Sequence, residues 1–144
     1  MIISIAEALN TRLADWADRL DFEVGSVVHD ARYEFSLSVR GGKPRIVLGH
    51  QFEAHLWLVV DDTWRADTAA DDLESLLYEW DEYLQIAQAV LNGDINPPAV
   101  SPNLPRNRWI IADPHVFFRP VNEPNGLIRR IMMRFQRKGE SGTR

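Results

Sequence analysis

The sequence contains no cysteine. This absence excludes a disulfide framework, a thiolate metal site and a cysteine nucleophile. The first seven residues have no basic segment ahead of an apolar stretch, so we expect no signal peptide. No apolar run approaches the roughly 18–20 residues that a membrane-spanning helix needs. We therefore expect a cytoplasmic protein without a membrane span.

Metal and cofactor motifs are also missing. None of the four histidines pairs with another at an HExxH-like spacing. They are His29, His50, His55 and His115. The stretch Gly41-Gly42-Lys43 lacks the spacing and the Ser or Thr of a phosphate loop, and a turn explains it better. The sequence therefore predicts no metal ion and no cofactor.

No serine lies in a Gly-x-Ser-x-Gly context, and no dinucleotide fingerprint follows an expected strand. We assign no catalytic residue, and an enzyme is a minority hypothesis. Its best candidates are scattered along the sequence and share no motif. They are His29, Asp30, His55 and Asp113.

The length and composition are those of one globular domain. The chain has 144 residues, of which 45% are hydrophobic and 26% charged. A chain of this length has room for one domain and little more. We expect a single domain over residues 1–138, followed by a flexible tail at 139–144.

Two long segments have the apolar spacing of amphipathic helices. Ser4 and Glu7 stand at capping-box spacing ahead of a helix predicted over residues 5–20. A second helix is predicted over residues 69–92, with Asp67 or Thr68 as the N-cap and Gly93 as a left-handed stop. Its apolar stripe consists of Leu73, Leu76, Leu77, Trp80, Leu84, Ala87 and Leu91.

Alternating apolar and polar residues predict strands between and after these helices. One strand is expected over 22–28 and another over 33–39. Residues 45–60 form either one bent strand or two, and residues 108–118 form one strand interrupted by Pro114. Short links between consecutive strands imply antiparallel pairing.

These elements define the expected fold class. We expect a two-layer α+β domain with an antiparallel sheet of about four to five strands. Two main helices cover one face of this sheet. A short C-terminal amphipathic helix follows at about residues 127–138, so that the order is α-β-β-β(β)-α-β-α.

The segment from Asp61 to Glu82 is strongly acidic, with nine acids and one base. Acidic residues at the start of the second helix stabilise it through its dipole, but the acids continue beyond the first two turns, where this effect has faded. A tyrosine among them is typical of a protein interface, although a solvated face remains the alternative. The candidate partner-binding residues here are Asp61, Asp62, Asp71, Glu74, Tyr78, Asp81 and Glu82.

Two of the five tryptophans are further candidates for partner binding. Trp57 has the opposite strand parity to Leu56 and Leu58, so we expect it to project from the solvent side of the sheet. Trp64 is expected in the acidic loop. Either side chain could anchor a partner, unless the C-terminal segment covers this face.

The charge changes sign near the C-terminus. Residues 1–118 carry 9 basic and 19 acidic residues, whereas residues 119–144 carry 7 basic and 2 acidic ones. The basic tail either folds back onto the acidic body or meets the acidic face of another copy, giving a homodimer. Its candidate binding residues are Arg129, Arg130, Arg134, Arg137 and Lys138.

These patterns favour a non-catalytic protein-binding module with an acidic face. A bacterial immunity or antitoxin-type protein that neutralises a basic partner is one concrete form, because acidic and basic faces speed each other's association. A secretion-chaperone-like adaptor or a small enzyme of unknown reaction are the alternatives. Nucleic acid is not the expected partner, since the acidic body repels phosphate.

Overall fold

The structure is a computed structural model that describes residues 4–99 and 108–121. Two helices and seven strands are present in these ranges. They are α1 (Ile5–Leu20), β1 (Phe22–His29), β2 (Arg32–Val39), β3 (Ile46–Gln51), β4 (His55–Val60), β5 (Trp64–Ala69), α2 (Leu73–Leu91), β6 (Trp109–Ala112) and β7 (His115–Pro120).

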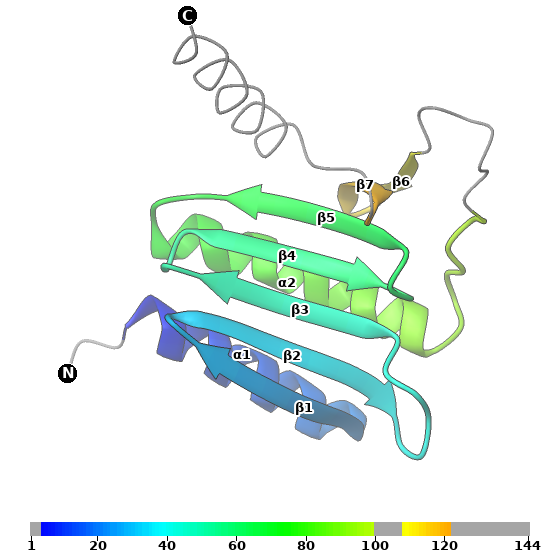
Figure 1. The fold of residues 1–144 in the computed structure, drawn as a ribbon, viewed down its shortest axis with the longest axis horizontal. Helices are drawn as coiled ribbons and strands as arrows, with labels where there is room; N and C mark the ends of the chain where they lie inside the picture. The colour runs from blue at the N-terminus through cyan, green and yellow to red at the C-terminus, as the bar shows by residue number, and fades with distance from the viewer. Residues whose placement is uncertain (1–3, 100–107, 122–144) are drawn as a thin grey trace, which may run out of the picture.

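The strands form one sheet in the order β1-β2-β3-β4-β5-β7-β6, and every neighbouring pair is antiparallel. Both helices lie on the same face of this sheet (Figure 1). Strand residues on that face, such as Leu37, Leu48 and Leu58, are fully buried beneath the helices. The opposite face has no helix over it among the described residues.

The predicted sheet of four to five strands with three helices is therefore wrong. Residues 45–60 form two strands, β3 and β4, and the predicted strand at 108–118 is the β6–β7 hairpin with its turn at Pro114. A further strand, β5, occupies the segment expected to be loop and helix start. The described residues contain two helices; the predicted C-terminal helix and tail lie outside them.

Strand β5 was missed because its alternation is chemically weak. Trp64, Ala66 and Thr68 face the helices, and Arg65 and Asp67 face the opposite side. Only Trp64 is a large apolar residue, so hydrophobicity alone shows no strand. The small side chains leave room for Tyr83 of α2, whose hydroxyl lies 2.8 Å from that of Thr68.

Both helices begin at side-chain caps. The Ser4 hydroxyl accepts a hydrogen bond from the Glu7 backbone at 3.1 Å, as the capping-box spacing predicted. Asp72, rather than Asp67 or Thr68, caps α2 and accepts from the Ser75 backbone at 2.7 Å. The predicted start of α2 at residue 69 is wrong because residues 64–69 pair with β4.

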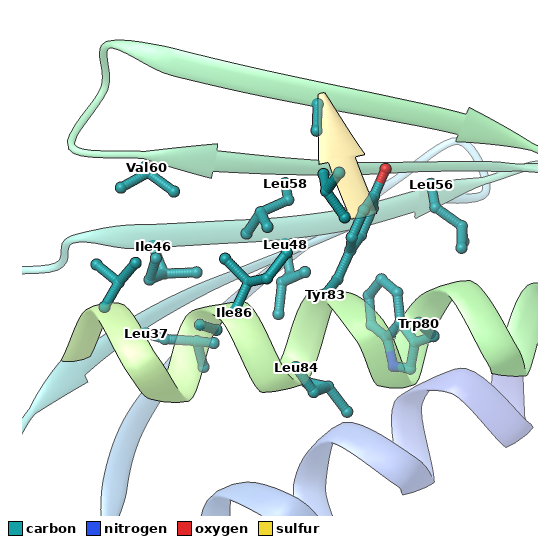
Figure 2. Packing of buried hydrophobic residues seen from close by; sticks show 14 of the residues in the cluster. Leu37, Ile46, Leu48, Leu56, Leu58, Val60, Trp80, Tyr83, Leu84 and Ile86 are labelled. Carbon is teal, nitrogen blue, oxygen red and sulfur yellow. The ribbon is translucent and has the colours of Figure 1, made fainter. Parts of the chain in front are cut away.

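Trp80 lies at the centre of the core. Figure 2 shows Trp80 and Tyr83 rising from α2 towards the strands, beside Leu84 and Ile86. The Trp80 side chain is fully buried, and its indole donates a hydrogen bond to the Leu9 backbone oxygen of α1 at 3.0 Å. One side chain therefore joins both helices to the sheet.

We expect Trp80→Ala to lower the free energy of unfolding by about 3–5 kcal/mol, because it opens a cavity where both helices meet the sheet. Urea denaturation of the wild type and the variant measures this loss. A loss below about 1 kcal/mol would mean that the side chain is not part of the core.

His50 is a polar residue in this apolar core. Its side chain is fully buried, its Nε2 lies 2.7 Å from the Asn10 side-chain oxygen, and its ring stacks on Tyr33. Burial lowers the pKa of His50 to about 4, although the negative charge of Glu53 opposes this shift. His50 is therefore neutral in the folded chain at neutral pH.

Stability should depend on this histidine in mildly acidic solution. The unfolded chain binds a proton at His50 below about pH 6.5, whereas the folded chain does so only below about pH 4. Lowering the pH through this window therefore favours unfolding, by roughly 3 kcal/mol in total. Compared with the wild type, His50→Gln should lose less stability between pH 7 and pH 4 in urea titrations; equal losses would contradict the assignment.

Candidate functional site

An acidic surface covers the first half of α2. Exposed Glu74 and Tyr78 are one helical turn apart, and Glu79 and Glu82 continue the same side of the helix. Asp113, in the β6–β7 turn, is close enough to act on the Tyr78 hydroxyl electrostatically. We call this surface the acidic patch: Asp71, Glu74, Tyr78, Glu79, Glu82 and Asp113.

No described residue neutralises the carboxylates of the acidic patch. None of them forms an ion pair with a described residue. A hydrogen bond to Glu82, together with its charge, raises the pKa of the Tyr78 hydroxyl. Burial, followed by the charge of Glu82, raises the pKa of Glu79. The charges of Glu82, Glu79 and Asp113 all act to raise the Tyr78 pKa, which indicates a negative potential that a cation would relieve.

Tyr78 is the aromatic centre of the patch. Its side chain is 65% exposed, which is unusual for so large a group. Glu82, one helical turn further along α2, lies close enough to raise the pKa of the phenol. The ring is therefore exposed and surrounded by carboxylates.

Three other predicted acids lie elsewhere or are already paired. Asp61 accepts two hydrogen bonds from Arg45, at 2.8 and 2.9 Å, and Arg45 also donates to the Val90 oxygen near the end of α2. The Asp61-Asp62 turn therefore lies about 25 Å from the start of α2, given the rise of a helix. Asp81 forms an ion pair with Arg12 of α1 at 2.8 Å.

Trp64 is not a surface residue. It lies in β5, is 1% exposed, and donates its indole hydrogen to the Pro98 oxygen at 2.9 Å. It contacts Trp109 edge to face in the extension of the core under β6 and β7. The predicted loop position is wrong because the segment pairs with β4 and β7.

A cavity of about 320 Å³ opens beside the acidic patch, between β5 and β7. These strands pair only through Trp64 with Pro120 and Arg65 with Arg119, and beyond these pairs they diverge. Glu79 belongs to both the cavity and the patch. The other polar groups that line the cavity include Arg65, Asp67, Thr68, Tyr83 and Arg119.

Trp57 lies on the helix-free face, as its parity predicted, but it is 1% exposed. Its indole ring lies against Gly49 and occupies the place where a Cβ atom of that residue would be. The guanidinium groups of Arg32 and Arg65 lie 4.7 and 5.6 Å from the ring centre. The expectation of a projecting tryptophan is wrong because polar side chains of neighbouring strands cover the ring.

A charged network surrounds this tryptophan. Asp67 accepts hydrogen bonds from Arg65 at 3.0 Å and lies 2.8 Å from the His55 ring nitrogen. Burial raises the pKa of Asp67, but the hydrogen bonds with His55 and Arg65 outweigh it, so that the net shift is downward. The network was not predicted from the sequence, where the isolated Gly49 in an apolar strand is its only signal.

The four enzyme candidates are not brought together. His29 and Asp30 contact each other at the exposed β1–β2 turn, and Asp113 lies in the β6–β7 turn. His55 is three strands away from His29 in the sheet, which corresponds to about 14 Å. Of the four candidates, only His55 contacts a polar partner that was not predicted, which is Asp67.

Three further predictions concern the basic tail, metal binding and a membrane-spanning helix. Arg129, Arg130, Arg134, Arg137 and Lys138 lie outside the described residues. Within residues 4–99 and 108–121, no group of three or more potential ligands could hold a metal ion. No helix in those ranges has the length and apolarity to cross a membrane.

The close contact of Trp57 with Gly49 can be tested by a double-mutant cycle. Gly49→Ala should lower the free energy of unfolding by about 1–3 kcal/mol, because the new methyl group meets the indole. In a Trp57→Ala background the same change should have little effect, and urea denaturation of the four proteins gives the coupling. Equal effects in both backgrounds would show that the two residues do not touch.

Comparisons of the chain with known protein families, with curated proteins and with solved structures find no match.

Proposed function

We propose that this chain is a non-catalytic protein-binding module whose acidic patch receives a basic surface of a partner protein. The observation that carries the proposal is the exposed Tyr78 among carboxylates that no cation of the described chain neutralises. An immunity or antitoxin-type protein that neutralises a basic toxin is one form of such a module, and a secretion-chaperone-like adaptor is another.

Electrostatics favour an incoming cation at this surface. Glu79 is partly buried, and Glu82 beside it raises the cost of its charge, as the raised pKa of Glu79 indicates. A lysine or arginine of the partner would lower that cost and would also shorten the diffusional search. Arginine fits best, because its planar group pairs with two carboxylate oxygens at once.

Tyr78 adds a contact that charge alone does not supply. Its ring offers a face for a guanidinium group and apolar area for neighbouring side chains. A tyrosine side chain has few rotatable bonds, so that little side-chain entropy is lost when a partner binds. Tyrosine at the centre of a charged surface is typical of binding hot spots.

The cavity beside the patch extends the surface inward. Glu79 lines both, so that a side chain bound at the patch has a polar cavity next to it. Asp67 of β5 also directs its backbone groups towards the cavity, because the Ala70 amide bonds to Ala54 on the β4 side and the odd-numbered residues of β5 face the other way. These groups offer hydrogen bonds to a partner's main chain.

A small enzyme is the second candidate, and one contact favours it. The 2.8 Å contact between His55 and Asp67 is the arrangement that orients a histidine as a general base. Turnover that is lost in His55→Ala and kept in the acidic-patch variant described next would favour this candidate.

We expect charge reversal of the patch to slow partner association while the chain stays folded. The variant is Asp71→Lys, Glu74→Lys and Glu82→Lys; its matched control is Glu7→Lys, Asp15→Lys and Asp18→Lys on α1, with the same change in net charge. Partners captured from a lysate of the source organism by the wild type are identified, and their association rates are measured at low salt. The patch variant should associate about 10- to 100-fold more slowly than the control.

The matched control separates a local effect from a change in overall charge. Equal rates for the patch variant and the control would refute the acidic patch as the binding surface. Circular dichroism of both variants, compared with the wild type, checks that each remains folded.

A further inference from the structure

Strand β1 forms an open edge of the sheet. It pairs with β2 over all eight of its residues, and no other described strand pairs with its outer side. Seven of its eight residues are exposed, including Val27 at 65% and Val28 at 60%. Lysine, proline and β-bulges usually keep the edges of sheets from pairing with other chains. Strand β1 contains none of them.

The opposite edge of the sheet differs in this respect. Strand β6 has only four residues, and Pro114 follows shortly after it. Short edge strands and nearby prolines discourage pairing with another chain. The two edges are therefore unequal, and β1 is the one suited to pairing.

The backbone groups that β1 leaves unpaired can be identified. The carbonyl groups of Ala31 and Leu37 bond to amides of the β3 side, so the even-numbered residues of β2 face β1. In the observed register, the odd-numbered residues of β1 are their partners. Phe22, Val24, Ser26 and Val28 therefore direct their amide and carbonyl groups outward.

The β1–β2 turn agrees with this direction. Asp30 and Ala31 both have positive φ, at 48° and 60°, between the paired residues His29 and Arg32. Such a two-residue turn closes on a hydrogen-bonded pair, which places His29 among the residues bonded to β2.

We propose that a second copy of this chain pairs with β1 in antiparallel fashion, about a two-fold axis centred on Ser26. In this arrangement the outward groups of Val24, Ser26 and Val28 meet those of Val28, Ser26 and Val24 of the second copy. About six main-chain hydrogen bonds result. The two sheets become one continuous sheet, with both helical layers on the same face.

The side chains select this register. A two-fold axis at Ser26 places Val24 directly opposite Val28 of the second copy, on the helix-covered face. On the other face it places Glu23 opposite His29 of the second copy, an acid against a basic group. An axis shifted to Gly25 or Val27 breaks both matches, since Val24 then faces Ser26 or Asp30 instead.

The dimer leaves the acidic patch accessible. The cavity beside the patch lies between β5 and β7, towards the edge of the sheet opposite β1. The dimer would therefore carry two patches at its two far ends, available to a partner with repeated basic surfaces. The inference does not depend on the proposed function, since it rests on β1 alone.

Substitution of Ser26 tests the pairing. Ser26→Pro removes an amide hydrogen that the β1–β2 ladder does not use, so the fold should be retained while the dimer loses two central hydrogen bonds. Ser26→Ala keeps the amide and is the matched control. By light scattering after size exclusion and by sedimentation, the wild type and Ser26→Ala should be dimers and Ser26→Pro a monomer. A monomeric wild type at sub-millimolar concentration, or a dimeric Ser26→Pro variant, would overturn the proposal.

A charge exchange tests the register without proline. Glu23→Lys places lysine against His29, and His29→Glu places two glutamates face to face, so each should raise the dimer dissociation constant about tenfold. The double variant restores the opposite charges and should dimerise at least as well as either single variant. Failure of this rescue would refute the register. The triple charge-reversal variant of the acidic patch should remain dimeric. Loss of partner binding in that variant can therefore be distinguished from loss of the dimer.

Discussion

The burial of α2 against the sheet is the constraint on which the other features depend. Trp80, Ile86 and Val90 face the strands and are fully or almost fully buried. Because neighbours on a helix surface are three or four residues apart, this packing leaves Glu74, Tyr78 and Glu82 together on the outside. The acidic patch is therefore positioned by the core, although its own residues contribute little to the packing. A change that rotated α2 would move the patch with it.

The sheet provides two further surface features at the places where its regular strand pairing stops. Two residue pairs join β5 to β7, and the divergence beyond them opens the cavity next to Glu79. At the other end of the sheet, pairing stops at β1 with a full set of outward backbone groups. Both features leave backbone hydrogen-bonding groups without a partner strand among the described residues, and such groups are where the two proposals place another chain.

Some of this could be predicted from the sequence, and the reasons for the misses are physical. The helix over residues 5–20 and its Ser4 cap were predicted because periodicity and capping depend on near neighbours. The strand β5 was missed because Ala66 and Thr68 are small, and their role is to accommodate Tyr83 from another element. The acidic patch was predicted in part: Glu79 and Asp113 joined it, whereas Asp61, Asp81 and the buried Trp64 did not belong to it.

The sequence by itself determined the local features: two amphipathic helices, the alternating strands, an acidic middle and the absence of cysteine chemistry. Each of these follows from residues within a few positions of one another. Only the tertiary structure decided which acids are neutralised, because Asp61 meets Arg45 and Asp81 meets Arg12 across long stretches of chain. It also decided that Trp57 is covered, since Gly49, Arg32 and Arg65 reach it from three other strands. Long-range contacts of this kind have no local signal in the sequence.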